Sequence, residues 1–158
     1  MDHKQDALDT FNSRMHCSQA VLTAFAQECG ITREQAKMLG SCFGSGMRKG
    51  QTCGACTGAL MVLGLKYGFT EGGSEYRARA DRVNDMMMDR FAKSCGSCLC
   101  NEILGCDIST AEGIRYALEN RLFTELCPKI VANAVDIVEG IIQEMERLSL
   151  PFGWILFS

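Results

Sequence analysis

The stretch 50–60 constrains the fold most strongly, because it places Cys53 and Cys56 at the start of a predicted helix. Thr52 is the expected N-cap, and apolar residues follow at helical positions until Gly68 ends the helix. The first turn of a helix has unpaired N–H groups and carries the positive end of the helix dipole. A thiol at such a position is shifted towards the thiolate, which is its reactive form. The stretch therefore predicts a helical protein with sulfur chemistry at a helix start.

Cys53 is predicted to be the most reactive thiol of the chain. The loop before it is expected to bring Arg48 and Lys49 close to the helix start, which adds positive potential there. These features predict that the pKa of Cys53 lies below about 8.5, the usual value for a free cysteine. Cys56 lies one turn deeper, where the dipole effect fades and burial raises the pKa of a thiol.

Apolar residues recur at helical spacing in the other long segments, and no convincing pair of strands is present. Cys17 is expected in the middle of the first helix, on a face that points into the protein. Cys127 is expected as the cap of the last helix, because Pro128 suits the first helical position. The predicted helical segments are 6–29, a short helix opened at Thr32, 53–67, 74–94, a helix from the capping box at 109–112 through Leu118, and 128–148.

A length of 158 residues suits one domain with a sizeable core. The expected fold is therefore all-α, a single-domain bundle of five or six helices over residues 1–149. Residues 150–158 form an apolar tail around Trp154. We expect this tail to pack against the last helix or against a second subunit in a homo-oligomer, since it would otherwise expose a large apolar patch.

Charge and hydropathy exclude several classes of partner. The net charge is −3 and no dense Lys/Arg face is present, so nucleic acid is not an expected partner. No apolar run approaches the ~20 residues that a membrane span needs. The first residues lack the apolar segment of a signal peptide, which indicates a cytoplasmic protein.

The ten cysteines are the compositional anomaly of the chain. Four of them fall within the segment 95–106, a density that packing alone does not explain: Cys95, Cys98, Cys100 and Cys106. In a cytoplasmic chain such clustering is more typical of metal binding or redox chemistry than of a disulfide framework.

These motifs resemble the family of redox-active proteins that is named for its C_GCAxxG_C_C cysteine pattern. The resemblance covers about residues 16–129 and is strongest in the stretches 52–60 and 100–107. It implies that the motif cysteines are Cys17, Cys53, Cys100 and Cys127. Cys106 matches a subset of relatives. The departures from the family pattern are His16 in the place of the usual Asn, and the additional cysteines Cys56, Cys95 and Cys98.

The first functional hypothesis is thiol–disulfide exchange or electron transfer with a partner protein or a small thiol. Cys53 would attack, and the resulting mixed disulfide would be resolved by a second thiol. The candidates for that second thiol are Cys56, Cys17, Cys100 and Cys127.

The second hypothesis is a zinc or iron–sulfur site with cysteine ligands. The ligands would be Cys17, Cys53, Cys100 and Cys127, with Cys106 as a further candidate. A third possibility is that the cysteines only pack as small apolar residues. Both functional hypotheses predict that the four motif cysteines meet in space although they lie far apart in the sequence.

Overall fold

The computed structural model describes residues 2–149, and this part of the chain is all-α with only an isolated bridge between Thr52 and Leu99. It contains eight α-helices and two π-type turns. The predicted fold class is confirmed. The helices are α1 (His3–Asn12), α2 (Cys17–Ala24), α3 (Arg33–Gly40), α4 (Gly54–Tyr67), α5 (Ser74–Cys95), α6 (Cys100–Leu104), α7 (Ala111–Glu119) and α8 (Cys127–Ser149), and the turns are η1 (Gly46–Gly50) and η2 (Leu122–Leu126).

The prediction of five or six helices was too low, mainly because the first predicted helix is divided. Arg14 adopts a left-handed backbone conformation with φ of 70°, which ends the helical path after α1. His16 is then extended and serves as the N-cap of a new helix, α2. The short α6 adds a further helix between α5 and α7.

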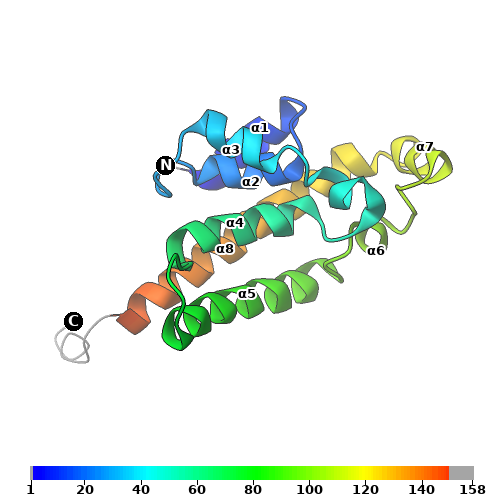
Figure 1. Cartoon of the computed structure of the whole chain (residues 1–158). Coiled ribbons are helices and arrows are strands. Elements are labelled where there is room, and N and C mark those ends of the chain that lie inside the picture. Colours follow the sequence, from blue (N-terminus) through cyan, green and yellow to red (C-terminus); the bar gives the residue numbers. More distant parts are fainter. Residues whose placement is uncertain (1, 150–158) are drawn as a thin grey trace, which may run out of the picture.

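The long helices α4, α5 and α8 lie side by side, α1 and α2 cover α4 and α8 from the other side, and α3 packs on α2 (Figure 1). The short helices α6 and α7 lie together at one end of the molecule (Figure 1). The core between these layers contains fully buried side chains from four different helices. The largest include Leu22, Leu63, Met87, Phe91, Val131 and Ile141.

Helix α4 approaches α2 closely because it carries glycine where the two helices touch. A Cβ atom added at Gly58 would lie 2.7 Å from the carbonyl oxygen of Ser18 and 3.0 Å from its Cα. These neighbours are backbone atoms of α2, so they can give way only if the whole helix moves. Gly64, in the same helix, has open space around its Cβ position.

We expect Gly58→Ala to lower the free energy of unfolding by about 1–3 kcal/mol, the usual cost of overpacking. Gly64→Ala is the matched control and should raise it by about 0.5–1 kcal/mol, because alanine is the better helix former. Urea unfolding of both variants, followed by circular dichroism, measures the difference. Equal effects of the two substitutions would contradict the close α2–α4 contact.

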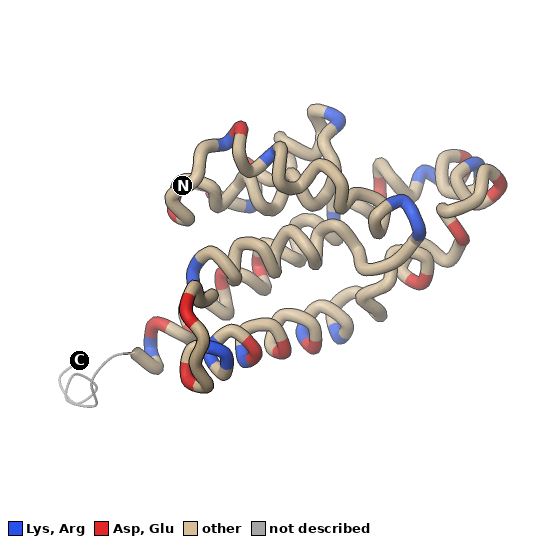
Figure 2. Tube along the Cα trace, in the orientation of Figure 1, with Lys and Arg blue, Asp and Glu red and all other residues tan. Residues whose placement is uncertain are grey.

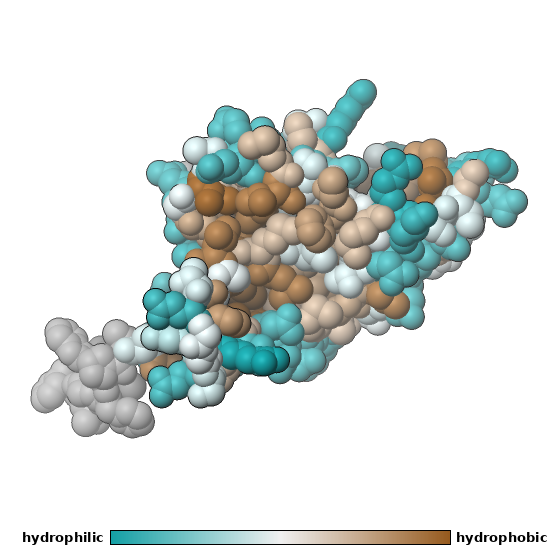
Figure 3. Space-filling view, viewed as in Figure 1, coloured by the Kyte–Doolittle hydropathy of each residue, from teal (hydrophilic) through white to brown (hydrophobic). Residues whose placement is uncertain are grey.

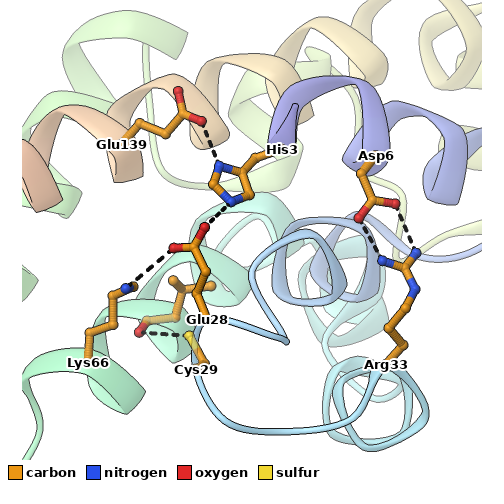
Figure 4. A network of polar contacts seen from close by, with 8 residues as sticks. His3, Asp6, Glu28, Cys29, Arg33, Lys66 and Glu139 are labelled. Carbon is orange, nitrogen blue, oxygen red and sulfur yellow. Dashed lines mark hydrogen bonds and ion pairs between the residues drawn. The ribbon is translucent and has the colours of Figure 1, made fainter. Parts of the chain in front are cut away.

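His3 ties the N-terminal helix to two other parts of the fold (Figure 4). Its Nδ1 lies 2.8 Å from a carboxylate oxygen of Glu139 in α8, and its Nε2 contacts Glu28 in the loop after α2. The ring also stacks on Phe25, with 4.2 Å between ring centroids. A second link joins Arg33 of α3 to Asp6 of α1 through two hydrogen bonds. These contacts hold α1 against the bundle.

Charged residues lie mainly on the outer turns, with both signs interspersed (Figure 2). Apolar side chains gather on the face that α3 and α4 share (Figure 3). Within residues 2–149 no helix combines the length and the apolar character that a bilayer crossing requires. The predicted apolar tail, 150–158, lies outside the residues that the structure describes.

Candidate functional site

Four cysteines that are far apart in the sequence line one cavity of about 190 Å³. These are the four that were predicted to meet: Cys17, Cys53, Cys100 and Cys127. That prediction is confirmed, while their chemical roles stay predictions. The remaining lining residues are uncharged or apolar apart from His16, and they are Phe11, Met15, Ser45, Ile103, Leu104, Phe123 and Ile130.

Each of the four cysteines stands at a helix start. Cys17, Cys100 and Cys127 are the first residues of α2, α6 and α8, and Cys53 is the N-cap of α4. The prediction that Cys17 lies in the middle of a helix was therefore wrong, because the break at residue 14 moves the helix start to it. Backbone N–H groups at two of these starts reach a cysteine sulfur: those of Cys17 and Ser18 bond to Cys17, and that of Ala55 bonds to Cys53.

A short antiparallel pairing joins the segment that carries Cys53 to the segment that carries Cys98 and Cys100. The amide of Cys53 donates to the carbonyl oxygen of Cys98 at 2.8 Å, and the amide of Cys100 donates to that of Gln51 at 2.7 Å. Thr52 and Leu99 form the bridge between these bonds. The prediction of Thr52 as the N-cap of α4 was wrong, since Thr52 is held in this pairing and Cys53 takes the cap position.

Cys17 is the thiol whose ionised form the structure stabilises. The thiol of Cys53 donates a hydrogen bond to it, and the backbone N–H groups of Ser45, Cys17 and Ser18 donate to it as well. Burial of the sulfur raises the pKa of Cys17, but these donors outweigh that effect and lower the pKa to about 7. At neutral pH about half of the protein therefore carries a thiolate at this position.

The pKa of Cys53 is shifted in the opposite direction, well above its ordinary value. The causes are its hydrogen bond to Cys17, the burial of its side chain and the negative charge of Cys17. The prediction that Cys53 has the lowered pKa was therefore wrong. Two neighbouring thiols cannot both ionise at neutral pH, and Cys17 receives three backbone N–H bonds whereas Cys53 receives one from Ala55.

Cys100 and Cys127 form the other thiol walls of the cavity and keep their protons. Burial raises the pKa of each to about 12, and the negative charge of Cys17 adds to the shift. Near neutral pH the four-cysteine cavity therefore holds at most one thiolate, on Cys17, while Cys53, Cys100 and Cys127 keep their protons.

Two of the predicted site residues do not line this cavity. Cys106 lies outside it, although its charge still raises the pKa of Cys100. Cys56 is fully buried, and its sulfur faces Met88 of α5 and the thiol of Cys98. The structure therefore pairs Cys53 with Cys17, and Cys56 with Cys98.

Arg48 and Lys49 are exposed, and neither is among the groups that shift the pKa of Cys17 or Cys53. The two side chains therefore do not supply the positive potential that was expected of them, and backbone N–H groups stabilise the thiolate of Cys17 instead. Ser45 supplies one of these from a left-handed conformation, with φ of 54°, in the loop before η1. Sequence reasoning missed this donor.

The sequence feature that could have indicated how closely the backbone approaches the start of α2 is the glycines around the cavity. A Cβ at Gly44 would lie 2.2 Å from the ring of His16, and a Cβ at Gly54 would lie 2.8 Å from the sulfur of Cys17. Both glycines therefore make room for the residues that open α2. Gly44 stands in the glycine-rich stretch between α3 and α4, and Gly54 is the first residue of α4, where the missing side chain lets the backbone pass next to the Cys17 sulfur.

No group of three or more His, Cys, Asp or Glu side chains within residues 2–149 is arranged to hold a metal ion. The ligand roles predicted for Cys17, Cys53, Cys100, Cys106 and Cys127 thus stay predictions.

The family model described as "Putative redox-active protein (C_GCAxxG_C_C)" matches residues 15–141. The chain belongs to this C_GCAxxG_C_C family. The matched range spans all four cysteines of the cavity and Cys106 as well. Searches of curated proteins and of solved structures gave no match.

Proposed function

We propose that the protein is a thiol–disulfide redox protein in which Cys17 is the attacking thiol and Cys53 the resolving thiol. The observation that carries this proposal is the hydrogen-bonded pair itself. Cys17 accepts hydrogen bonds from the Cys53 thiol and from three backbone N–H groups, and both cysteines line a cavity that a substrate sulfur can enter. Membership of the redox-active family supports the same chemistry.

In the first step, the Cys17 thiolate attacks one sulfur of a substrate disulfide. A bond forms between Cys17 and that sulfur, the substrate S–S bond breaks, and the second substrate sulfur leaves as a thiolate. The leaving thiolate takes up a proton, for which the thiol of Cys53 is the nearest donor described at the site. The product is a mixed disulfide between Cys17 and the substrate.

In the second step, Cys53 attacks the sulfur of Cys17 and releases the remaining substrate sulfur as a thiolate. The substrate disulfide has then gained two electrons, and the protein has lost two in forming a Cys17–Cys53 disulfide. An external dithiol would restore the reduced protein by the same exchange in reverse.

The charge on Cys17 orders these two steps. While Cys17 is a thiolate, its hydrogen bond and its charge keep the proton on Cys53. Once Cys17 is bound in a mixed disulfide, both causes are removed, and the pKa of Cys53 is raised only by burial and by the charge of Cys100. Cys53 therefore becomes a competent nucleophile after Cys17 has reacted and not before.

The lining of the cavity favours an uncharged substrate sulfur. None of the lining residues is Lys, Arg, Asp or Glu, and most are apolar. A volume of about 190 Å³ suits a small disulfide or one cystine side chain of a partner protein rather than a large cofactor.

Oxidation of the reduced protein with one equivalent of diamide tests the proposal. We expect a Cys17–Cys53 disulfide, detected by tandem mass spectrometry after the remaining thiols are alkylated. Tryptic peptides carry Cys17 together with Cys29, and Cys53 together with Cys56, so fragment ions must assign the linked sulfurs. Cys42→Ser, at an exposed thiol, is the control and should leave the product unchanged.

A product in which Cys17 and Cys53 both stay alkylatable while other cysteines are linked would overturn the proposed pair. Metal analysis of the same anaerobic preparation tests the second hypothesis directly. Stoichiometric zinc or iron that Cys17→Ser releases would replace the redox role by a ligand role.

A further inference from the structure

Three sulfur atoms meet on the side of α4 that faces α5. The Cys56 sulfur lies 3.6 Å from the thioether sulfur of Met88 in α5. The thiol of Cys98, just after α5, hydrogen-bonds with Cys56 and also donates to the carbonyl oxygen of Met88 at 3.4 Å. This sulfur cluster of Cys56, Cys98 and Met88 is separate from the four-cysteine cavity, since none of the three lines it.

The sulfur cluster is closed towards the core and reachable from one side. Cys56 is 0% exposed and packs within the main apolar core. Met88 and Cys98 are half-buried, so the cluster borders solvent through them. Cys95 lies close enough for its charge to act on the pKa of Cys56.

We propose that this cluster is a binding site for a single Cu(I) ion, with two thiolates and one thioether as ligands. Soft sulfur donors select Cu(I), and a methionine thioether is a ligand that zinc sites do not use. Zinc takes four N, O or S ligands, whereas Cu(I) is satisfied by two or three sulfurs. The set contains two cysteine thiols, and the thioether of Met88 supplies the third sulfur.

The spacing of the sulfurs suits a shared ion. Two sulfurs bound to one metal at about 2.3 Å each lie at most about 4.6 Å apart. The 3.6 Å between the sulfurs of Cys56 and Met88 is within that limit, so these two ligands can share an ion without movement of α4 against α5. The ion would displace the thiol protons of Cys56 and Cys98 to solvent, and the partly exposed Cys98 would meet it first.

The site does not rest on the redox role proposed for the cavity. Cys17 and Cys53 contribute no ligand to it, so either proposal can fail while the other stands. The chain departs from its family pattern at both Cys56 and Cys98, which makes copper binding a property of this chain and of relatives with the same additions.

Anaerobic titration with Cu(I) in competition with bathocuproine disulfonate tests the proposal. The full-length protein with Cys17→Ser and Cys53→Ser is used as the background, so that the cavity pair does not bind copper. We expect one Cu(I) per chain and an X-ray absorption spectrum with sulfur neighbours only. The protein without these two substitutions should retain at least one Cu(I) per chain as well.

Met88→Leu conserves volume and keeps the fold while removing the thioether. It should weaken Cu(I) retention by about tenfold or more, because the loss of even a residue that only hydrogen-bonds to a ligand weakens metal affinity by about tenfold. Met86→Leu, at a half-buried position two residues away, is the matched control and should change nothing. Cys98→Ser should abolish retention.

Two results would overturn the copper site. One is the failure of the background protein to retain Cu(I) against the chelator. The other is equal retention by the Met88→Leu and Met86→Leu variants together with a spectrum lacking a third sulfur, which would place the ion on other thiols. Circular dichroism of each variant shows whether it is folded. If Cys98→Ser does not fold, the comparison of Met88→Leu with Met86→Leu still decides the test.

Discussion

Replacing Cys53 with alanine is expected to slow the alkylation of Cys17 at pH 7 by up to about 50-fold. The first cause of the low Cys17 pKa, about 7, is the hydrogen bond from the thiol of Cys53. If that pKa returns to about 9, the thiolate fraction at pH 7 falls from about one half to about one hundredth. The backbone donors that remain make this an upper bound. Rates are measured with limiting iodoacetamide and peptide mapping across pH 5–10.

Cys53→Ser is the matched control, because its hydroxyl can still donate to the Cys17 sulfur. We expect it to keep the midpoint of the Cys17 alkylation profile near pH 7, while Cys53→Ala moves the midpoint upward. Cys17 should also be the first thiol alkylated in the unsubstituted protein. Faster alkylation of Cys53 than of Cys17 would reverse the assignment of the thiolate.

Raising the pH above about 9 is expected to destabilise the reduced protein strongly. The pKa values of Cys56, Cys100 and Cys127 are raised to about 12 in the folded state, chiefly by burial. In the unfolded chain these thiols lose their protons near pH 9, so between pH 9 and 12 the folded state binds more protons. Its stability therefore falls with rising pH, by about 1.4 kcal/mol per pH unit for each thiol.

Cys17 acts with the opposite sign and in a lower pH window. Its folded pKa of about 7 lies below that of the unfolded chain, so it adds stability as the pH rises from about 7 to 9 and adds no more above that. Urea midpoints measured anaerobically with excess reductant should rise slightly and then fall steeply. Cys100→Ser removes one buried ionisable group, so the loss of stability per pH unit should be smaller by the contribution of one thiol. Constant midpoints between pH 9 and 11 would contradict the burial of these thiols as neutral groups.

The fold class was predictable because helical periodicity is a local property of the sequence. Helix boundaries were less so. The left-handed turn falls on Arg14, whereas glycine or asparagine is the usual residue in that conformation, and the nearby Asn12 is still the last residue of α1. The consequence for the site was large, because the turn makes Cys17 a helix start and gives it the N–H donors that were assigned to Cys53.

The meeting of the four motif cysteines was predictable from family resemblance, from the expected helix starts at Cys53, Cys100 and Cys127, and from the inward helix face expected for Cys17. Which of them carries the charge was not, because that depends on the count of N–H donors around each sulfur. Ser45 contributes one donor from a loop that is distant in sequence from Cys17. The pairing of Cys56 with Met88 was likewise hidden, since Met88 reads as ordinary core packing until α5 is placed against α4.

The antiparallel pairing of residues 51–53 with 98–100 acts as a mechanical link between two sulfur sites. The amide of Cys53 donates to the carbonyl oxygen of Cys98, so one bond joins a wall of the cavity to a member of the sulfur cluster. A second bond, from Cys100 to Gln51, closes the pairing at its other end. A local opening that moves the backbone at Cys53 to admit a bulky reactant breaks the hydrogen bond to Cys98 as well. Amide hydrogen exchange at Cys53 therefore reports on the opening of both sites.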